Sequence, residues 1–292
     1  GRYLSLDGSD GMINEFEIQK IDENEGVCWV QHVSKLTAIY RLRRKNECTR
    51  NELNTYSRIL LEFYIDQGIV PADGIITNQT PICGLLPERY PTMADFLDYL
   101  RLRVKNHVPA DDAEHGELGK KFLLQLQEIC DTYENLVRNY GYLLNGYTSI
   151  RNISQTQLLA FNISTVLKLE PSISSGILYN ALMLFWDHCV RVGSRMKSLY
   201  EAKKIDEQDI IHSMVVVDES HHILSAQYAD CVRQMTIMAR EMRKYFSGIV
   251  FATQLITDNL QGKTTEPEEK AVQDLFDLAT YRFVGKQTAT CI

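Results

Sequence analysis

Two short apolar runs, at positions 214–217 and 249–252, constrain this chain most strongly. The first run ends in Asp218 and Glu219, the second leads to Gln254, and the stretch between them has the pattern of one helix. Strands joined through a helix pair in parallel, and strands buried on both faces have continuous β-branched runs. The pattern therefore predicts two buried parallel strands that carry acid and amide side chains to the same edge of one sheet.

This set of side chains suits nucleotide hydrolysis. Ligands of open α/β sheets bind beyond the carboxyl ends of the strands, where Asp218, Glu219 and Gln254 stand. In nucleotide hydrolases of this build, one acid holds the magnesium ion and an adjacent carboxylate orients or deprotonates the attacking water. The amide of Gln254 can contact a phosphate or that water. The alternative is that the two acids only open the following helix, since acidic residues favour the first turn through the helix dipole.

His221 and His222 follow the acids and suggest a zinc or iron site, because histidine and carboxylate are common ligands of these metals. Adjacent residues of a helix point about 100° apart, so the two imidazoles rarely face one ion. No third histidine stands at a useful spacing. We therefore place His221 near the nucleotide crevice instead of in a catalytic metal site.

Arg240, Arg243 and Lys244 close the helical stretch. Cations near a helix C-terminus interact favourably with the last carbonyls and with the helix dipole, and this structural role is sufficient for Lys244. A second basic cluster is predicted to be a solvated loop or helix end, and the alternative is that it contacts an acidic partner. Its members are Arg41, Arg43, Arg44 and Lys45.

Composition limits the class of protein. With 292 residues and 45% hydrophobic content, the chain can bury a sizeable core in one or two domains. The formal charge of −7 argues against an extended basic surface that could neutralise the phosphates of DNA or RNA. Strong direct nucleic-acid binding is therefore not expected. The longest apolar stretch, 177–186, contains Asn180 and is too short to span a bilayer, so it predicts a buried helix. Seven cysteines without a C-x-x-C pair indicate reduced thiols in a cytosolic setting.

The chain alternates between an α/β pattern and a helical one. A strand is predicted near Tyr3–Leu6, followed by a small excursion around Cys28–His32. Three helical patterns come next: one opened by a capping box of Thr49 and Glu52, one opened by Thr92 and Asp95, and one over 118–140. Strands and helices then alternate again: LLAFNIS, a helix at 177–200, VVVD, a helix to Lys244, IVFATQ, a helix near 272–278, and a strand at Tyr281–Val284.

Strands separated by helical patterns imply parallel pairing through right-handed crossovers, so the predicted fold class is α/β. The helical part interrupts this pattern as an insertion that can form its own subdomain or lid. We therefore divide the chain into a core, residues 1–35 and 150–292, and a helical insertion, residues 36–149.

Several longer motifs resemble one protein family. VVVDESHHIL and AREMRKYFSGIVFATQ resemble the Walker B and downstream motifs of the TraC/TraE-type conjugation ATPases. These are the large ATPases of type IV secretion systems, within the HerA/FtsK-like group of RecA-fold motors. The opening segment GRYLSLDGSDGMINEFEI is similar to the family segment that carries Asn-Pro-Phe, although Asn14, Glu15 and Phe16 stand there in this chain. PTMADFLDYL and LLAFNISTVL also resemble landmarks of the family, so the resemblance covers nearly the whole chain.

The resemblance implies a RecA-like parallel sheet flanked by helices, with a large all-helical insertion. It also implies magnesium-dependent ATP hydrolysis, in which Asp218 holds magnesium through water, Glu219 polarises the attacking water and Gln254 senses the γ-phosphate. It further implies that Arg243, with Arg240 behind it, reaches the nucleotide of a neighbouring subunit.

The family implies a cytoplasmic hexamer that uses ATP to drive pilus assembly or the transfer of DNA or protein. Such a motor associates with the inner face of the cell membrane through other type IV secretion components. Two alternatives stay open: a non-catalytic protein-interaction module of the secretion apparatus, and a DNA-translocating coupling ATPase of the same superfamily. The net negative charge of the chain argues against the DNA-translocating alternative, because DNA is itself negatively charged.

One motif of the family does not occur in this sequence. The phosphate-loop pattern G-x-x-x-x-G-K-[ST] fails at Gly262, Lys263 and Thr264, because Thr257 stands where the first glycine should be. In the family this loop precedes the segment that opens the present chain. We therefore expect the loop upstream of Gly1, and we expect the chain without it to be inactive, because the loop cradles the phosphates.

Overall fold

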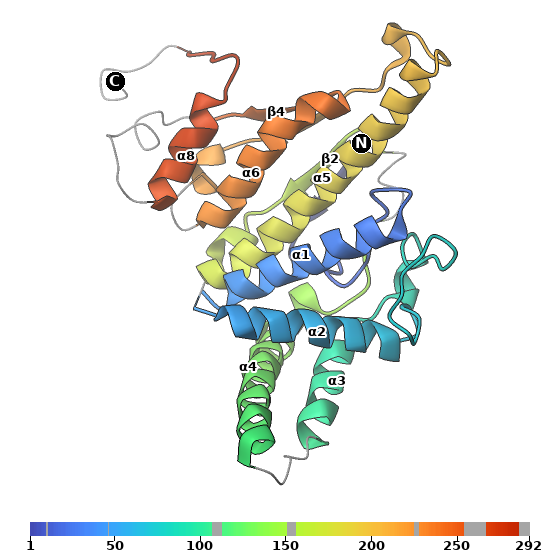
Figure 1. The fold of residues 1–292 in the computed structure, drawn as a ribbon. Coiled ribbons are helices and arrows are strands. Elements are labelled where there is room, and N and C mark those ends of the chain that lie inside the picture. The colour runs from blue at the N-terminus through green and yellow to red at the C-terminus, as the bar shows by residue number, and fades with distance from the viewer. Residues whose placement is uncertain are drawn as a thin grey trace, which may run out of the picture. The chain divides into compact units, whose positions relative to one another are not determined.

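The chain divides into two compact units, Gly1–Gly176 and Ile177–Ile292 (Figure 1). The long helix α5 (Pro171–Glu201) contains the boundary between them. Within the described part of the chain, none of the helices has the length and hydropathy that a bilayer-spanning segment requires. The computed structural model describes residues 1–9, 11–45, 47–106, 113–150, 156–224, 228–253 and 267–285.

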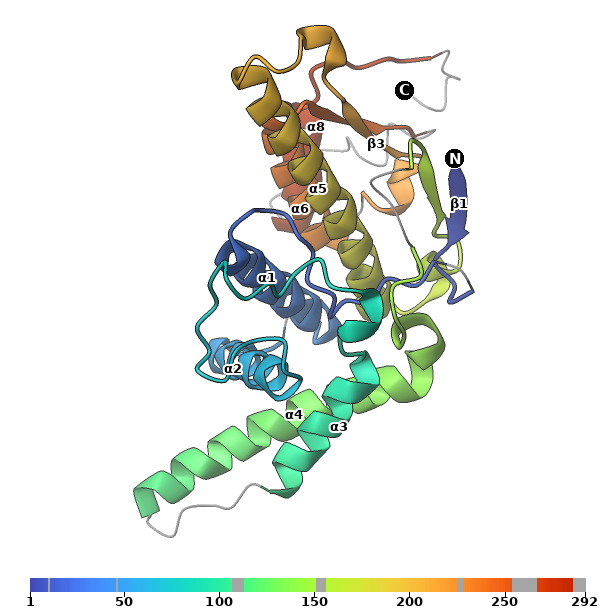
Figure 2. The same ribbon diagram turned by 90° about the vertical axis from the view of Figure 1, so that its right-hand side faces the viewer.

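The first unit contains a parallel pair of strands. β1 (Arg2–Ser5) pairs with β2 (Leu159–Asn162), and Arg2 stands opposite Leu159 in the register (Figure 2). The strand predicted near Tyr3–Leu6 and the strand predicted in LLAFNIS are both confirmed. The chain between these two strands is mainly helical.

The helices of the first unit match the predicted helical part. α3 and α4 pack side by side, as both ribbon views show (Figures 1 and 2). The bounds of α3 and α4 confirm the helices predicted from Thr92 and over 118–140. The longer helices are α1 (Glu25–Arg43), α2 (Arg50–Asp66), α3 (Met93–Lys105) and α4 (Ala113–Leu144), and the short 3-10 turns are η1 (Pro87–Arg89) and η3 (Val166–Lys168).

Helix α1 replaces the small excursion predicted around Cys28–His32, so that prediction is wrong. Asn24 begins the helix, because its side chain accepts hydrogen bonds from two backbone N–H groups of the first turn. Cys28, His32 and Leu36 then recur at four-residue spacing and are buried. Cys28 and His32 therefore lie on the buried face of a continuous helix.

Helix α2 is capped by Thr49 as predicted, but the predicted capping box is only half formed. The Thr49 hydroxyl accepts a hydrogen bond from the Glu52 backbone N–H. The Glu52 carboxylate does not return the bond; it accepts from the Tyr40 hydroxyl at 2.6 Å and from Arg44 Nε at 3.2 Å. Partners on α1 and at its end therefore replace the local contact. In α3 both halves of the predicted box form.

An aromatic cluster fills the core of the first unit. Tyr40 stacks on Tyr56 at a ring-centroid distance of 4.4 Å. Phe96 meets Tyr133 edge to face at 4.8 Å, and the hydroxyls of Tyr56 and Tyr133 lie 2.6 Å apart. Phe16 lies 5.2 Å from Phe96 and brings the opening segment into the cluster. Rings of this size bury a large apolar area, and their paired hydroxyls avoid the cost of an unsatisfied polar group.

A buried ion pair joins the opening segment to α1. The Arg43 guanidinium donates to both oxygens of Glu15, at 2.7 and 2.5 Å, and both side chains are almost fully buried. The prediction of a solvated basic cluster is therefore wrong for Arg43. Arg44 is also held, because its Nε lies 3.2 Å from Glu52 Oε1. Charges inside a protein persist only when they are paired, so Arg43 and Arg44 are part of the structure of this unit, whereas Arg41 and Lys45 are exposed.

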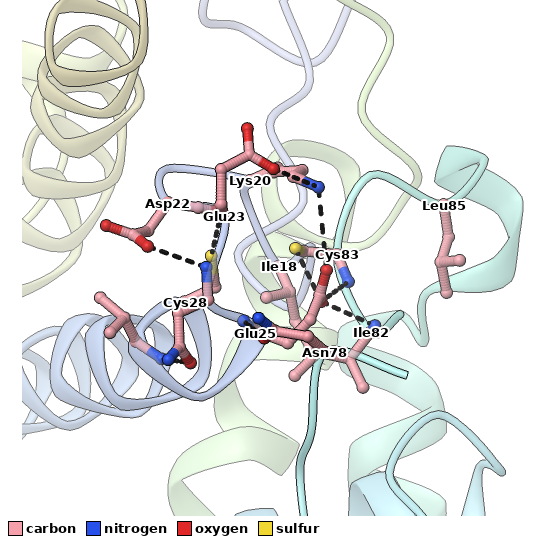
Figure 3. Close-up of polar contacts among 12 residues, drawn as sticks. Ile18, Lys20, Asp22, Glu23, Glu25, Cys28, Asn78, Ile82, Cys83 and Leu85 are labelled. Carbon is pink, nitrogen blue, oxygen red and sulfur yellow. Dashed lines mark hydrogen bonds and ion pairs between the residues drawn. The ribbon is translucent and has the colours of Figure 1, made fainter. Parts of the chain in front are cut away.

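The carboxylate of Glu25 anchors a loop to the start of α1 (Figure 3). Its Oε2 accepts hydrogen bonds from the backbone N–H of Ile82 at 2.9 Å and of Cys83 at 3.1 Å, and from the Cys83 thiol at 2.9 Å. Lys20 Nζ lies 3.9 Å from the other oxygen. Burial, together with the hydrogen bond to Glu25, raises the pKa of the Cys83 thiol. The protonated thiol is thus a structural donor, and the cysteines that the structure describes are all free.

The second unit contains the strand–helix–strand element predicted from the two apolar runs. β3 (Ser213–Val217) and β4 (Ser247–Phe251) are parallel, and α6 (Ala229–Glu241) lies between them in the chain. α8 (Pro267–Asp277) packs beside α6 (Figure 1). The 3-10 turns are η4 (Glu207–Asp209), η5 (Ser220–His222) and η7 (Met242–Tyr245).

Two predictions about strands are corrected by the structure. The strand predicted at Tyr281–Val284 does not form, and side chains such as Phe283 are almost fully exposed. The single predicted sheet is also not found: the strands of the described residues form two separate parallel pairs, β1–β2 and β3–β4. An apolar run becomes a strand only where a neighbour satisfies its backbone hydrogen bonds. The α/β class and the parallel pairing are confirmed, whereas the described residues do not form a complete RecA-like sheet.

His32 is a buried titratable group of the first unit. Its Nε2 lies 2.7 Å from the Tyr64 hydroxyl, which donates to the carbonyl of Phe16 at 2.5 Å, so Nε2–H is the donor toward Tyr64. Burial, with a smaller contribution from Lys35, holds the pKa of His32 well below its usual value. The folded unit therefore contains a neutral imidazole at this position.

We predict that the first unit loses stability below the ordinary histidine pKa. The unfolded chain binds a proton at His32 near pH 6.5 and the folded chain does not, so the free energy of unfolding falls by up to about 1.4 kcal/mol per pH unit below that value. Trp29 lies 5.2 Å from the Tyr64 ring, so its fluorescence in a Trp186→Phe background reports denaturant unfolding of this unit. His32→Gln keeps an N–H donor but binds no proton in this range. It should therefore remove the contribution of His32 to the slope of the unfolding free energy against pH. Equal slopes for the two proteins between about pH 7.5 and 5.5 would contradict the prediction.

Candidate functional site

The carboxyl ends of β3 and β4 meet at one rim of their sheet. Val217 stands opposite Phe251 in the register, and the ladder continues past both strand ends. The Ala252 N–H donates to the Val217 carbonyl at 2.9 Å, and the Ser220 N–H donates to the Ala252 carbonyl at 2.8 Å. The residues that follow Val217 therefore emerge beside those that follow Phe251, as the sequence predicted.

Glu219 has an unusual backbone conformation at this rim. Its φ of 46° and ψ of 45° lie in the left-handed region, which is uncommon for a residue with a side chain and is concentrated at functional sites. Its N–H donates to Asp218 Oδ1 at 2.9 Å. The Asp218 side chain is exposed and the Glu219 side chain is half-buried. Two adjacent carboxylates thus have different surroundings, which lets them carry different roles.

The donor set at the rim fits a magnesium ion held through water. Mg²⁺ prefers oxygen ligands, keeps several waters and is bound in nucleotide sites by one or two carboxylates together with the substrate phosphates. Asp218 offers an exposed carboxylate beside the place where β4 ends. The hydrogen bond from the Glu219 N–H restrains the orientation of that carboxylate.

The two histidines lie on the short turn η5, directly after the acids. His221 Nδ1 is 3.3 Å from Glu219 Oε2, and the rings of His221 and His222 have centroids 4.0 Å apart. The prediction that the two rings diverge is therefore wrong, since the rings lie against each other on this short turn. Among the residues that the structure describes, no group of three or more His, Cys, Asp or Glu side chains could enclose a metal ion.

The other predicted site residues are not all at this rim. Gln254 lies outside the described residues; Thr253, the residue before it, is half-buried just beyond β4. Arg243 is exposed on η7, which packs against β4 and leads into its first residue. Arg240 is exposed in the last turn of α6. Because a strand of five residues spans roughly 16 Å, both arginines belong to the edge of the sheet opposite Asp218.

Comparisons with known proteins identify the fold. No family model matches the chain. The uncharacterized protein pXO2-09 of Bacillus anthracis is 31% identical over 295 residues, which cover 97% of this chain and 44% of that protein. The solved structure of VirB4 of Thermoanaerobacter pseudethanolicus matches with a TM-score of 0.69 at 17% identity, over 99% of this chain and 65% of that chain.

The chain has the VirB4 fold. The resemblance to type IV secretion ATPases that the motifs indicated is confirmed by this fold. The match to VirB4 extends over both units, since nearly the whole chain is covered. The chain spans less than half the length of the B. anthracis relative and 65% of the VirB4 chain.

In this VirB4 fold, helix α5 supports the turn that carries Arg243. A Cβ atom at Gly193 would lie 2.3 Å from the carbonyl oxygen of Tyr245 and 2.5 Å from its Cα, so only glycine permits the close approach of α5 to η7. The Trp186 ring meets the Tyr245 ring edge to face at 5.7 Å. The residue pattern did not predict this support, although a glycine inside an apolar helix can mark close packing.

We predict that Gly193→Ala destabilises the second unit by about 1–3 kcal/mol, because the added methyl group meets backbone atoms that cannot turn away. Gly248→Ala is the matched control, since a Cβ there meets nothing within 4 Å. Denaturant unfolding followed by Trp186 fluorescence in a Trp29→Phe background measures both variants. Equal stability of the two variants would show that the close approach of α5 is not required.

Proposed function

We propose that this chain is part of the ATPase core of a type IV secretion motor, which uses ATP to drive pilus assembly or the transfer of DNA or protein. The observation that carries the proposal is the rim of the β3–β4 sheet, where Asp218 and Glu219 stand side by side in the VirB4 fold. VirB4 is a type IV secretion ATPase, and the B. anthracis relative is plasmid-encoded, as expected for a conjugative element.

In the proposed reaction, ATP binds beyond the rim, water attacks the γ-phosphorus, and the bond from that phosphorus to the β–γ bridging oxygen breaks, so that ADP leaves and phosphate is formed. Asp218 holds magnesium through water, and bound magnesium neutralises charge that develops on the phosphate oxygens. Glu219 orients the attacking water and accepts its proton. Gln254, which follows β4 in the chain, contacts the γ-phosphate, and His221 lies beside the nucleotide.

Arg243 and Arg240 act in this proposal on a nucleotide bound by another copy of the protein. Within one copy, the length of β4 separates them from Asp218 and Glu219. A ring of copies, such as a hexamer, can bring the opposite edges of two sheets together. An arginine delivered across an interface stabilises the charge of the transferring phosphoryl group and is worth about 10³–10⁵ in rate.

The helical part of the chain is assigned to contacts with other components of the apparatus. We assign the core to residues 1–35 and 150–292 and the helical insertion to residues 36–149. The motor would work in the cytoplasm at the inner face of the cell membrane, where partner proteins hold it.

ATP hydrolysis by the full-length protein that contains this chain tests the proposal. Glu219→Gln should lower kcat by about 10²–10⁴, because an amide cannot accept the proton of the attacking water. Glu207→Gln is the matched control, since Glu207 is exposed on η4 of the same unit. Full turnover by Glu219→Gln would remove the catalytic assignment.

Two further outcomes of that assay separate the alternative functions. A wild-type protein that binds partner proteins of the apparatus but hydrolyses no ATP would be an interaction module. Hydrolysis that rises on addition of duplex DNA would indicate a DNA-translocating ATPase. The salt dependence of the affinity for DNA would then show how many phosphate contacts contribute to binding.

A mixing experiment tests the role of Arg243. Arg243→Ala alone should lower turnover by about 10³. A mixture with Glu219→Gln should regain part of the activity, because some interfaces then combine one intact Glu219 with one intact Arg243. Lys244→Ala is the matched control, since Lys244 Nζ is paired with Glu241 at 2.5 Å on its own helix end. A mixture that stays inactive would contradict a role across the interface.

A further inference from the structure

We infer that His221 is a positioning residue that orients the Glu219 carboxylate toward the attacking water, an inference that rests on the proposed function. His221 Nδ1 lies 3.3 Å from Glu219 Oε2. Both of these atoms are shielded from solvent, although each side chain as a whole is partly exposed. The contact is therefore made in the protected part of the turn, while the exposed parts of the two side chains face outward.

The turn itself places the two side chains together. Ser220, between them, is fully buried and its N–H is held by the carbonyl of Ala252 at the end of β4. The left-handed conformation of Glu219 reverses the chain immediately before this anchor. Glu219 and His221 therefore leave the buried Ser220 in the same direction, and a strained backbone is maintained only where surrounding contacts hold it.

The chemistry of the contact suits a positioning role. Nδ1 and Glu219 Oε2 lie at ion-pair distance, without a hydrogen bond between them, so a proton on Nδ1 would attract the carboxylate and restrain a side chain that otherwise has several rotatable bonds. A general base acts only within hydrogen-bond reach of the proton that it removes, so the restraint acts on the rate of the chemical step and not on the binding of ATP.

His222 provides a control within the same turn. Its ring lies against that of His221 at 4.0 Å, but its side chain is exposed. The two residues share the same residue type and the same turn. A difference between their variants therefore reports the contact with Glu219 and not a general effect on η5.

The test uses the full-length protein and magnesium-ATP. His221→Ala should lower kcat by about 10- to 100-fold, as expected when a residue that orients a catalytic group is removed, with the KM and the Kd for ATP changed by less than about twofold. His221→Asn should restore most of the loss, because its amide N–H can take the place of Nδ1–H. His222→Ala should stay within about twofold of the wild type. The double variant Glu219→Gln/His221→Ala should be no slower than Glu219→Gln alone, because the two residues act as one unit.

Each result separates this inference from the proposed function. Unchanged kcat in His221→Ala, or a loss confined to ATP binding, overturns the positioning role while a defective Glu219→Gln variant leaves the ATPase assignment intact. A Glu219→Gln variant with wild-type turnover, or a wild type without turnover, overturns the ATPase assignment and this inference with it. Thermal unfolding of all variants identifies any loss of kcat that comes from misfolding. If His221→Ala misfolds, the kcat of His221→Asn tests the positioning role, and a kcat near that of the wild type supports it.

Discussion

The candidate site depends on the parallel hydrogen-bond ladder between β3 and β4. This ladder extends one step beyond each strand, through Ala252 to Val217 and through Ser220 to Ala252. Beside this extension Ser220 is buried and Glu219 adopts the left-handed conformation. Of the two adjacent carboxylates held there, that of Asp218 is exposed and that of Glu219 is half-buried.

The first unit depends on a different interaction, the buried pair of Glu15 and Arg43. The family that the chain resembles usually has a proline at the position of Glu15. Here the carboxylate reaches Arg43, while the Asn14 side chain donates to the Pro91 carbonyl and accepts from the Phe16 N–H. Removal of one partner of such a pair leaves a buried charge and costs about 3–5 kcal/mol. Glu15 and Arg43 are therefore energetically coupled, and the opening segment is held in the aromatic core by Phe16.

Local pattern alone predicted the elements around the candidate site. The apolar runs that became β3 and β4, their parallel pairing and the helix between them follow from residue type and spacing. The cap at Thr92 follows from one hydroxyl and one carboxylate three residues apart. These predictions succeed because each depends on residues that are near one another in the chain. The roles of Gln254, Arg240 and Arg243 stay predictions, since they concern a nucleotide and a second copy.

Predictions failed where a distant partner decided the outcome. The Glu52 carboxylate contacts Tyr40 and Arg44 instead of completing its predicted cap, and Arg43 pairs with Glu15 instead of facing solvent. Spacing along the chain does not show which of these partners the packing of α1 brings near. Residue pattern could place Asp218 and Glu219 after a strand, and the proposed chemistry starts from that placement. It could not place His221 against Glu219 or bring α5 onto Tyr245, because both contacts require strands and helices to be packed in three dimensions first. The sequence alone therefore determined that two acids follow strand β3. Their orientation depends on the hydrogen bonds between β3 and β4, which form only in the folded unit.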